Sequence, residues 1–275
     1  AASSCTSSGS PSGARSIPDS GDAGIEAHFR GWVCYNLVMD DSIKGNVILV
    51  DKPAGMSSFG VVARVRQKLS ERAGMIEVVG KDGVRRQKRR KVKVGHTGTL
   101  DPFATGLLIL LAGKETKKAN DFLKLDKEYV ATVRIGAVST TGDPEGTITE
   151  QDVAQKPNKA AVEKCVQNLV GENWQQVPQF SAVKINGQRA YKLAREGKAV
   201  EMPVRKVQIY EIELLEYEWP DLKIRCKVSS GTYIRALGED IGKALGTGAY
   251  VTELRRTQVG NYRIEQAKTL EELMA

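Results

Sequence analysis

Apolar residues recur along this chain with two periods, one typical of strands and the other of helices. An uninterrupted apolar run at residues 104–112 predicts a buried element, and a shorter run at 46–50 predicts a buried strand. Residues 127–136 alternate between apolar and polar side chains, which is typical of a half-buried strand. Residues 207–217 and 222–229 predict two antiparallel strands joined by a short turn.

Three segments between these strands have apolar positions at helical spacing. Ser57 or Ser58 is the expected N-cap of the first helix. Residues 159–170 predict an amphipathic helix, and residues 234–245 predict another that ends at Gly246. Because the strands are separated by helical pieces of unequal length, we expect an α+β domain around a mixed sheet rather than a regular doubly wound fold.

The composition allows one sizeable folded domain. The chain has 275 residues, of which 41% are hydrophobic, and no apolar run reaches the roughly eighteen residues of a membrane span. Its formal net charge of +8 favours a polyanionic partner. Four cysteines without a CxxC pair and only two histidines argue against a zinc site and a disulfide framework, so we expect a protein of the reducing cytoplasm.

Two segments differ from this pattern. Residues 1–23 are rich in Ser, Gly and Ala and predict disorder, and we assign residues 1–38 to an extension or an artefact outside the main domain at 39–275. Residues 85–93 hold seven basic side chains in nine positions. Such a run is usually a solvated loop, but its place directly before the motif described next indicates contact with phosphates. Neutralising its arginines should then weaken binding to a polyanion.

The most informative segment is Gly-His-Thr-Gly-Thr-Leu-Asp-Pro-Phe-Ala-Thr-Gly at residues 95–106. Its only carboxylate, Asp101, lies in a turn-rich loop five positions after His96. Glycine allows a positive φ or the close approach of a ligand, and Pro102 stiffens the turn after the acid. A reactive side chain on a rigid loop beside a buried element is typical of a catalytic group, whereas an isolated loop aspartate is more often a capping residue.

This dodecapeptide closely resembles the signature motif of the TruB family of RNA pseudouridine synthases. Segments similar to other motifs of that family occur in the family order, and the resemblance spans residues 44–272. They are Val-Asp-Lys-Pro-Ala-Gly-Met-Ser-Ser at 50–58, Asp-Lys-Glu-Tyr at 126–129, Gln-Phe-Ser-Ala-Val-Lys-Ile-Asn-Gly-Gln-Arg-Ala-Tyr at 179–191, Gly-Thr-Tyr-Ile-Arg at 231–235 and Leu-Arg-Arg-Thr at 254–257. The resemblance implies the pseudouridine synthase catalytic fold, with a mixed, mainly antiparallel sheet flanked by helices and loops.

The resemblance also implies roles for single residues. Asp101 matches the essential aspartate, Tyr129 the tyrosine that stacks on the extruded base, and Arg235 the arginine that pairs with the catalytic carboxylate. A guanidinium beside that acid would keep it ionised and oriented. His96 matches the histidine that fills the space of the departing nucleotide, and Leu254 matches a leucine that packs near the base.

Further substrate-binding residues are expected around this centre. Lys52 in the first motif is expected to support the catalytic loop, and Tyr233 belongs to the motif of the catalytic arginine. Residues 174–200 interleave basic and aromatic side chains, which suits stacking on unpaired bases beside phosphate contacts. In the family this segment corresponds to a thumb-like element that closes over RNA, and within it we expect Lys184 and Tyr191 to contact the substrate.

The implied activity is that of a tRNA pseudouridine synthase acting on uridine 55 in the T-arm. This isomerisation needs no cofactor, and the sequence has no P-loop, dinucleotide fingerprint or metal-ligand spacing. We expect a cytoplasmic monomer that binds tRNA without a membrane or an obligate protein partner, and too few residues follow the last motif for a complete C-terminal PUA module. Two alternatives stay open, namely a tRNA-folding chaperone of the same fold and the modification of T-loop-like hairpins in other RNAs.

Overall fold

The computed structural model describes residues 43–44, 46–185, 187–197 and 200–275, with side chains from residue 46 onward. The described residues all belong to one structural unit. The extension predicted at residues 1–38 lies outside the described residues, so that prediction stays untested.

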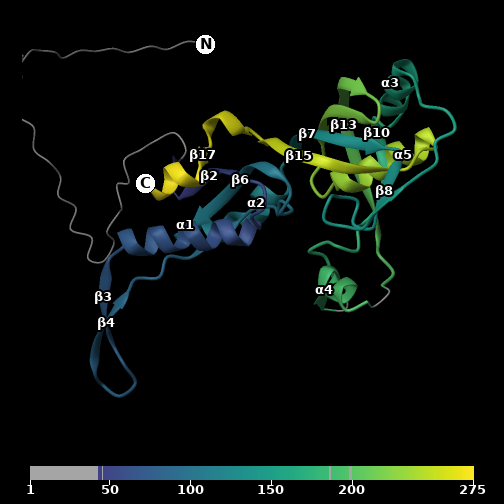
Figure 1. The fold of residues 1–275 in the computed structure, drawn as a ribbon. Coiled ribbons are helices and arrows are strands. Elements are labelled where there is room, and N and C mark those ends of the chain that lie inside the picture. Colours follow the sequence, from purple (N-terminus) through teal and green to yellow (C-terminus); the bar gives the residue numbers. More distant parts are fainter. Residues whose placement is uncertain (1–42, 45, 186, 198–199) are drawn as a thin grey trace, which may run out of the picture. The chain divides into compact units, whose positions relative to one another are not determined.

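A mixed sheet of eleven strands forms the centre of the fold (Figure 1). Eight strands follow one another in the order β1-β2-β6-β15-β7-β14-β13-β10, while β5, β16 and β17 pair with β6, β15 and β2. In the described part of the sheet, only the β15–β6 and β17–β2 pairs are parallel, which confirms the predicted mixed, mainly antiparallel architecture. The strands are β1 (Ile43–Lys44), β2 (Val47–Lys52), β5 (Val94–His96), β6 (Thr105–Ala112), β7 (Lys127–Ile135), β10 (Gly171–Gln176), β13 (Val204–Glu218), β14 (Asp221–Val228), β15 (Ala249–Val259), β16 (Tyr262–Arg263) and β17 (Lys268–Thr269).

The predicted helices form where the apolar spacing placed them. Ser57 is the N-cap of the first helix, since its Oγ accepts a hydrogen bond from the amide of Gly60 at 3.1 Å. The helix predicted at residues 234–245 ends at Gly246, which has a left-handed φ of 68°. The described helices are α1 (Ser58–Arg72), α2 (Ala119–Leu123), α3 (Lys159–Asn168), α4 (Ala190–Arg195), α5 (Ile234–Leu245) and α6 (Leu270–Met274), with 3₁₀ turns at Gly113–Lys118 and Ile264–Gln266. Three small hairpins complete the fold, namely β3 (Met75–Val79) with β4 (Arg85–Arg89), β8 (Ala137–Ser139) with β9 (Ile148–Glu150), and β11 (Lys184–Ile185) with β12 (Gln188–Arg189).

Strand β6 is buried on both faces, which explains its uninterrupted apolar sequence. On one face, Leu108 belongs to the main core cluster together with Val61 of α1. On the other face, Leu107 and Ile109 form a second cluster against Phe122 of α2. A strand covered on both sides is a rigid support, and β6 therefore fixes the loop that directly precedes it.

The charged segment before this loop is more ordered than the sequence analysis predicted. The sequence analysis treated residues 85–93 only as a basic run, usually a solvated loop, whereas β3 and β4 form an antiparallel hairpin in the register Met75↔Arg89 to Val79↔Arg85. The physical reason is that residues 75–79 are mostly strand-forming aliphatic side chains, and the turn between the strands contains Gly83 with a φ of +74°. Because four of the five residues of β4 are basic, the sequence did not indicate this pairing.

Replacing Gly106 by alanine is expected to destabilise the fold by about 3 kcal/mol or more. Gly106 has a φ of +100°, and an added Cβ would lie 2.7 Å from the backbone nitrogen of Arg256 on β15. Gly95→Ala is the matched control within the same motif, because a Cβ there meets no atom within 4 Å. Urea unfolding of the two variants measures the difference. Equal stability of both would contradict the close approach of β6 and β15.

Candidate active site

The loop that carries Asp101 is held by the segment at the start of α1. The Oγ of Ser58 donates a hydrogen bond to the carbonyl of Leu100 and accepts one from its amide, each at 2.8 Å. The amide of Gly55 donates to the carbonyl of Pro102 at 2.8 Å. The two motifs, which are far apart in the sequence, therefore form one rigid unit on either side of Asp101.

Lys52 at the end of β2 also stabilises this unit. Its fully buried ammonium group donates to the carbonyls of Pro53 (2.8 Å), Met56 (2.7 Å) and Pro102 (3.2 Å), which uses all three of its protons. Burial lowers the pKa of Lys52 to about 8, and the negative charge of Asp101 opposes that change. These contacts match the supporting role expected for Lys52.

Arg235 joins two carboxylates across the site. Its Nε lies 3.0 Å from Oδ2 of Asp101, and its Nη1 lies 3.1 Å from Oδ2 of Asp143. The same guanidinium donates to the carbonyls of Thr141 at 2.8 Å and Phe180 at 2.9 Å. With four acceptors around one buried planar group, the position of Arg235 and hence of Asp101 is closely defined.

The two carboxylates differ in their access to solvent. The side chain of Asp101 is 34% exposed, whereas that of Asp143 is only 4% exposed. Burial raises the pKa of Asp101 above its ordinary value, Arg235 lowers it, and the charge of Asp143 raises it again. The arginine therefore limits the rise, while Asp101 is the acid that a substrate can reach.

Arg256 on β15 holds the other side of the catalytic loop. Its Nε donates to the carbonyl of Leu107 at 2.7 Å and its Nη2 to the carbonyl of Gly98 at 3.2 Å. The side chain is almost fully buried, at 1% exposure. These bonds connect the loop to the first residues of β6, so that Arg256 positions the loop without reaching the acid itself.

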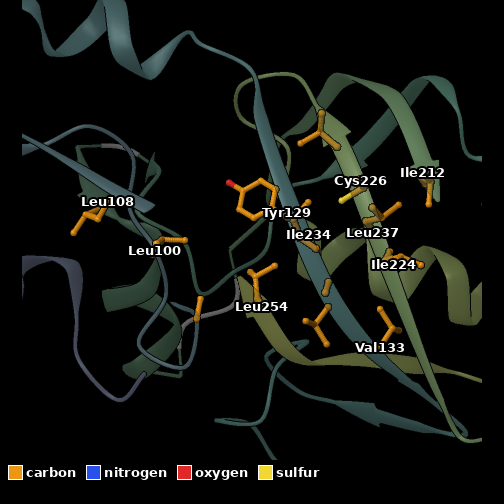
Figure 2. Packing of buried hydrophobic residues seen from close by; sticks show 14 of the residues in the cluster. Leu100, Leu108, Tyr129, Val133, Ile212, Ile224, Cys226, Ile234, Leu237 and Leu254 are labelled. Carbon is orange, nitrogen blue, oxygen red and sulfur yellow. The ribbon is translucent and has the colours of Figure 1, made fainter. Parts of the chain in front are cut away.

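Tyr129 lies on β7 beside the same centre. Figure 2 shows its ring at the edge of the core cluster, with Leu254 on the neighbouring strand β15. Burial raises the pKa of the Tyr129 hydroxyl, and Arg256 opposes this rise. Since the charge of Asp101 also raises this pKa, the two groups are within electrostatic reach of one another. Leu254 is 7% exposed and packs as a core residue.

Two motif residues, His96 at the end of β5 and Ser181, have a buried polar atom without a partner among the described residues. In His96 this atom is Nδ1. Burial lowers the pKa of His96, and the positive charges of Arg256 and Arg189 lower it further. The imidazole is therefore neutral at pH 7, and it can fill space beside a substrate without contributing charge.

Comparison with known proteins agrees with this geometry. A family model described as the N-terminal domain of TruB family pseudouridylate synthases matches residues 85–234, and one described as the C-terminal domain of tRNA pseudouridylate synthase B matches residues 235–275. The chain belongs to the TruB family.

Curated TruB relatives match most of the chain. It is 44% identical over 223 residues to the tRNA pseudouridine synthase B of Bacteroides fragilis, with 81% of this chain and 90% of the relative covered. It is 42% identical over 237 residues to the protein of the same name from Thermobifida fusca, with 83% and 74% covered. These matches confirm the resemblance stated from the motifs.

Solved structures with a related fold include larger assemblies. A chain in the crystal structure of a Cbf5-Nop10-Gar1 complex shares 30% identity with a TM-score of 0.60, over 83% of this chain and 53% of that one. A chain in an H/ACA RNP bound to a substrate RNA containing 2'-deoxyuridine gives 28% identity and a TM-score of 0.57, with 83% and 52% covered. This TruB-family chain therefore spans about half the length of those solved chains.

The thumb-like segment at residues 174–200 contacts the site near its start. The carbonyl of Phe180 accepts from Arg235, and Tyr233 is tied to β10 through Gln175, whose side chain binds its amide at 2.7 Å and its carbonyl at 3.0 Å. Lys184 is exposed on β11 and Tyr191 half-buried on α4. Neither side chain makes a hydrogen bond or ion pair with Asp101 or Asp143 among the described residues, so their RNA contacts stay predictions.

Two residues of the site were missed in the sequence. Asp143 was not among the predicted site residues. It lies in a turn in which the amide of Gly146 donates to its carbonyl at 3.4 Å, and no spacing rule connects it to Asp101. For Arg256 a signal was present, because it lies two positions after Leu254 on a strand and so shares its inward face. A charged residue at such an inward position indicates a buried role.

Two kinds of site are not found in the described part of the chain. No helix there is both long and apolar enough to cross a membrane. No group of three or more His, Cys, Asp or Glu side chains in those residues is arranged to bind a metal ion.

Proposed function

We propose that this chain is a tRNA pseudouridine synthase that isomerises uridine 55 in the T-loop, with Asp101 as its essential group. The observation that carries the proposal is the carboxylate of Asp101, which is partly exposed and held by buried Arg235 at 3.0 Å within the TruB-family motif. The names of the curated relatives support tRNA as the substrate class.

The reaction requires one bond to break and another to form on the same ribose. The N1–C1′ bond of uridine breaks, the uracil turns, and a C5–C1′ bond forms, while C5 loses a proton and N1 gains one. Asp101 either adds covalently to the substrate or abstracts a proton that allows the glycosidic bond to break. Both routes need an ionised acid in a fixed position, which is what Arg235 and the rigid loop supply.

The remaining residues would act on a base that has left its stack. Extrusion costs a few kcal/mol, and a neutral His96 in the vacated space would offset part of that cost. Tyr129, with a hydroxyl that stays protonated because its pKa is raised, would stack on the base and can donate a hydrogen bond. Lys184 and Tyr191 of the thumb-like segment would contact the RNA from the other side.

The partner in this account is the T-arm stem-loop of tRNA, recognised through its shape and its extrudable base. The net charge of +8 favours association with that polyanion. We further propose that the enzyme works in the cytoplasm as a monomer, without a membrane and without an obligate protein partner.

Mapping of the product tests the proposal. Unmodified tRNA transcripts and, separately, RNAs with T-loop-like hairpins are incubated with the protein, and pseudouridine is located by carbodiimide modification and primer extension. We expect a single new stop at position 55. Stops only in T-loop-like hairpins of other RNAs would replace the substrate, and tRNA refolding without any new stop would favour the chaperone alternative.

Replacing His96 by alanine is expected to slow single-turnover product formation by about 10–100-fold without abolishing it. The loss follows because the variant leaves the space of the extruded base unfilled. In a transcript whose uridine 55 has no neighbouring base to stack on, extrusion costs less. The difference in rate between the variant and the wild type should therefore be smaller on that transcript. A variant as fast as the wild type on both RNAs would show that His96 is only a structural residue.

A further inference from the structure

We propose that the β3–β4 hairpin and the strand that returns from it, residues 75–93, bind phosphates of the tRNA outside the T-arm stem-loop. We call this segment the basic hairpin. The inference rests on the proposed function for the identity of the RNA, and it adds a second RNA contact at a distance from the reacting base.

The basic hairpin concentrates the positive charge of the chain. It holds eight basic and two acidic side chains, a net charge of +6 out of the formal +8 of the whole protein. All five residues of β4 are exposed, so its basic side chains reach solvent on both faces of the hairpin. A two-stranded ribbon open on both faces can lie along the phosphate backbone of an RNA.

Part of this charge is paired within the protein. Arg85 lies 3.2 Å from Glu77, and Arg86 lies 2.5 Å from Asp82. Arg89 lies 3.2 Å from Glu71 of α1. These pairs are exposed and therefore weak, but they identify which side chains shape the hairpin.

The other basic side chains of β4 and of the segment that follows it form no ion pair among the described residues. Within the described residues no acidic partner is found for Lys88, Arg90, Lys91 or Lys93, and all four are exposed. They are the groups that remain for an external polyanion. The candidate phosphate-binding residues therefore narrow from the whole basic run to these four positions.

The basic hairpin is fixed to the C-terminal end of α1 (Figure 1). The amide of Arg90 donates to the carbonyl of Gly74 at 3.0 Å, and the amide of Val92 donates to Oγ of Ser70 at 3.1 Å. The opposite end of α1 begins at Ser58, which binds the catalytic loop. A helix of 15 residues is about 22 Å long, so Gly74 and Arg90 at the base of the hairpin lie roughly that far from Ser58, whereas Lys93 lies only three residues before His96.

The exposed surface of α1 connects the two ends. Phe59 and Arg66 are both exposed and are separated by seven positions, close to two helical turns, so they lie on one face of the helix. The guanidinium of Arg66 lies 6.0 Å from the centre of the Phe59 ring. Phe59 is 65% exposed. RNA that follows this face from the catalytic loop would pass an exposed aromatic residue and an arginine before it meets the hairpin.

The separation decides which part of the RNA is contacted. A nucleic-acid duplex carries a phosphate about every 3.4 Å of axis on each strand, so about 22 Å corresponds to roughly six phosphates. The basic hairpin extends beyond the end of α1, and it would reach past a short stem-loop bound at the catalytic loop. Phosphates of the remaining tRNA body are the polyanion available there.

The test compares two RNAs and two charge variants of the full chain. The hairpin variant carries Lys88→Gln, Arg90→Gln and Lys91→Gln, and it keeps Lys93, which lies three residues before His96. The control variant removes the same charge elsewhere by Lys156→Gln, Lys164→Gln and Lys223→Gln. Dissociation constants for full-length unmodified tRNA and for an isolated T-arm stem-loop are measured at several salt concentrations, together with the single-turnover rate at saturating stem-loop.

We expect the hairpin variant to bind full-length tRNA about tenfold more weakly than the wild type, with a salt dependence that is less steep by about two to three in log–log slope. Its affinity for the stem-loop and its saturated rate should stay within twofold of the wild type. Equal losses on both RNAs, no loss on either, or the same loss in the control variant would each overturn the inference. Because binding is measured apart from turnover, a failure of the proposed function would appear separately, as a wild type that forms no pseudouridine.

Discussion

Asp101→Asn is expected to lower the single-turnover rate of pseudouridine formation by about 10⁴-fold or more. Asparagine has nearly the same shape and can still accept a hydrogen bond from Arg235, but it cannot act as a nucleophile or accept a proton. The affinity for tRNA and the free energy of unfolding should change little, because the loop is held by Ser58 and Arg256 and not by the acid.

The control for this variant is Asp152→Asn, which removes the same charge from an exposed aspartate before α3. It should behave as the wild type in rate, in tRNA binding and in unfolding. If Asp101→Asn kept more than a tenth of the wild-type rate, Asp101 would not be the essential group, and the catalytic assignment would have to move to another residue.

The second large effect on the rate is expected when the ion pairs of Arg235 with Asp101 and Asp143 are changed. Arg235→Lys is expected to lower the rate by about 10²-fold or more, because a single ammonium cannot bind both carboxylates and the two carbonyls that the guanidinium serves. The variant should also lose about 2 kcal/mol or more of folding stability, because Asp143 is buried and loses its partner.

Asp143→Asn separates charge from geometry in the same cluster. The charge of Asp143 raises the pKa of Asp101, so its removal should lower that pKa. Since the reaction needs ionised Asp101, the acid limb of the rate profile should move to lower pH in the variant. An acid limb that stays in place or moves to higher pH would show that the two carboxylates are not coupled through Arg235.

The sequence predicted the elements and the chemistry of this fold better than their contacts. The buried element at 104–112, which forms strand β6, and the helix at 234–245 were evident because burial and amphipathic spacing depend on local sequence. The ion pair of Arg235 with Asp101 was predicted through the family resemblance, and the observed distance of 3.0 Å agrees with it. The roles of the individual residues remain predictions for the experiments above.

What could not be predicted depends on long-range packing. Asp143 reaches Arg235 because β8, β9 and α5 meet in space, and nothing local in the turn at residues 143–146 indicates that contact. The basic hairpin was hidden for the opposite reason, since its high charge outweighed a short aliphatic strand at 75–79. A charged run can thus form a defined element when its partner strand supplies the β-forming side chains.

The account as a whole depends on one activity, and tritium release measures it most directly. Unmodified tRNA that carries tritium at C5 of its uridines is incubated with the wild-type protein, and the label released to water is counted. We expect one tritium per tRNA molecule, because C5 of a single uridine exchanges its hydrogen for the bond to C1′. Release of no tritium by a folded protein that still binds the tRNA would contradict the proposed function.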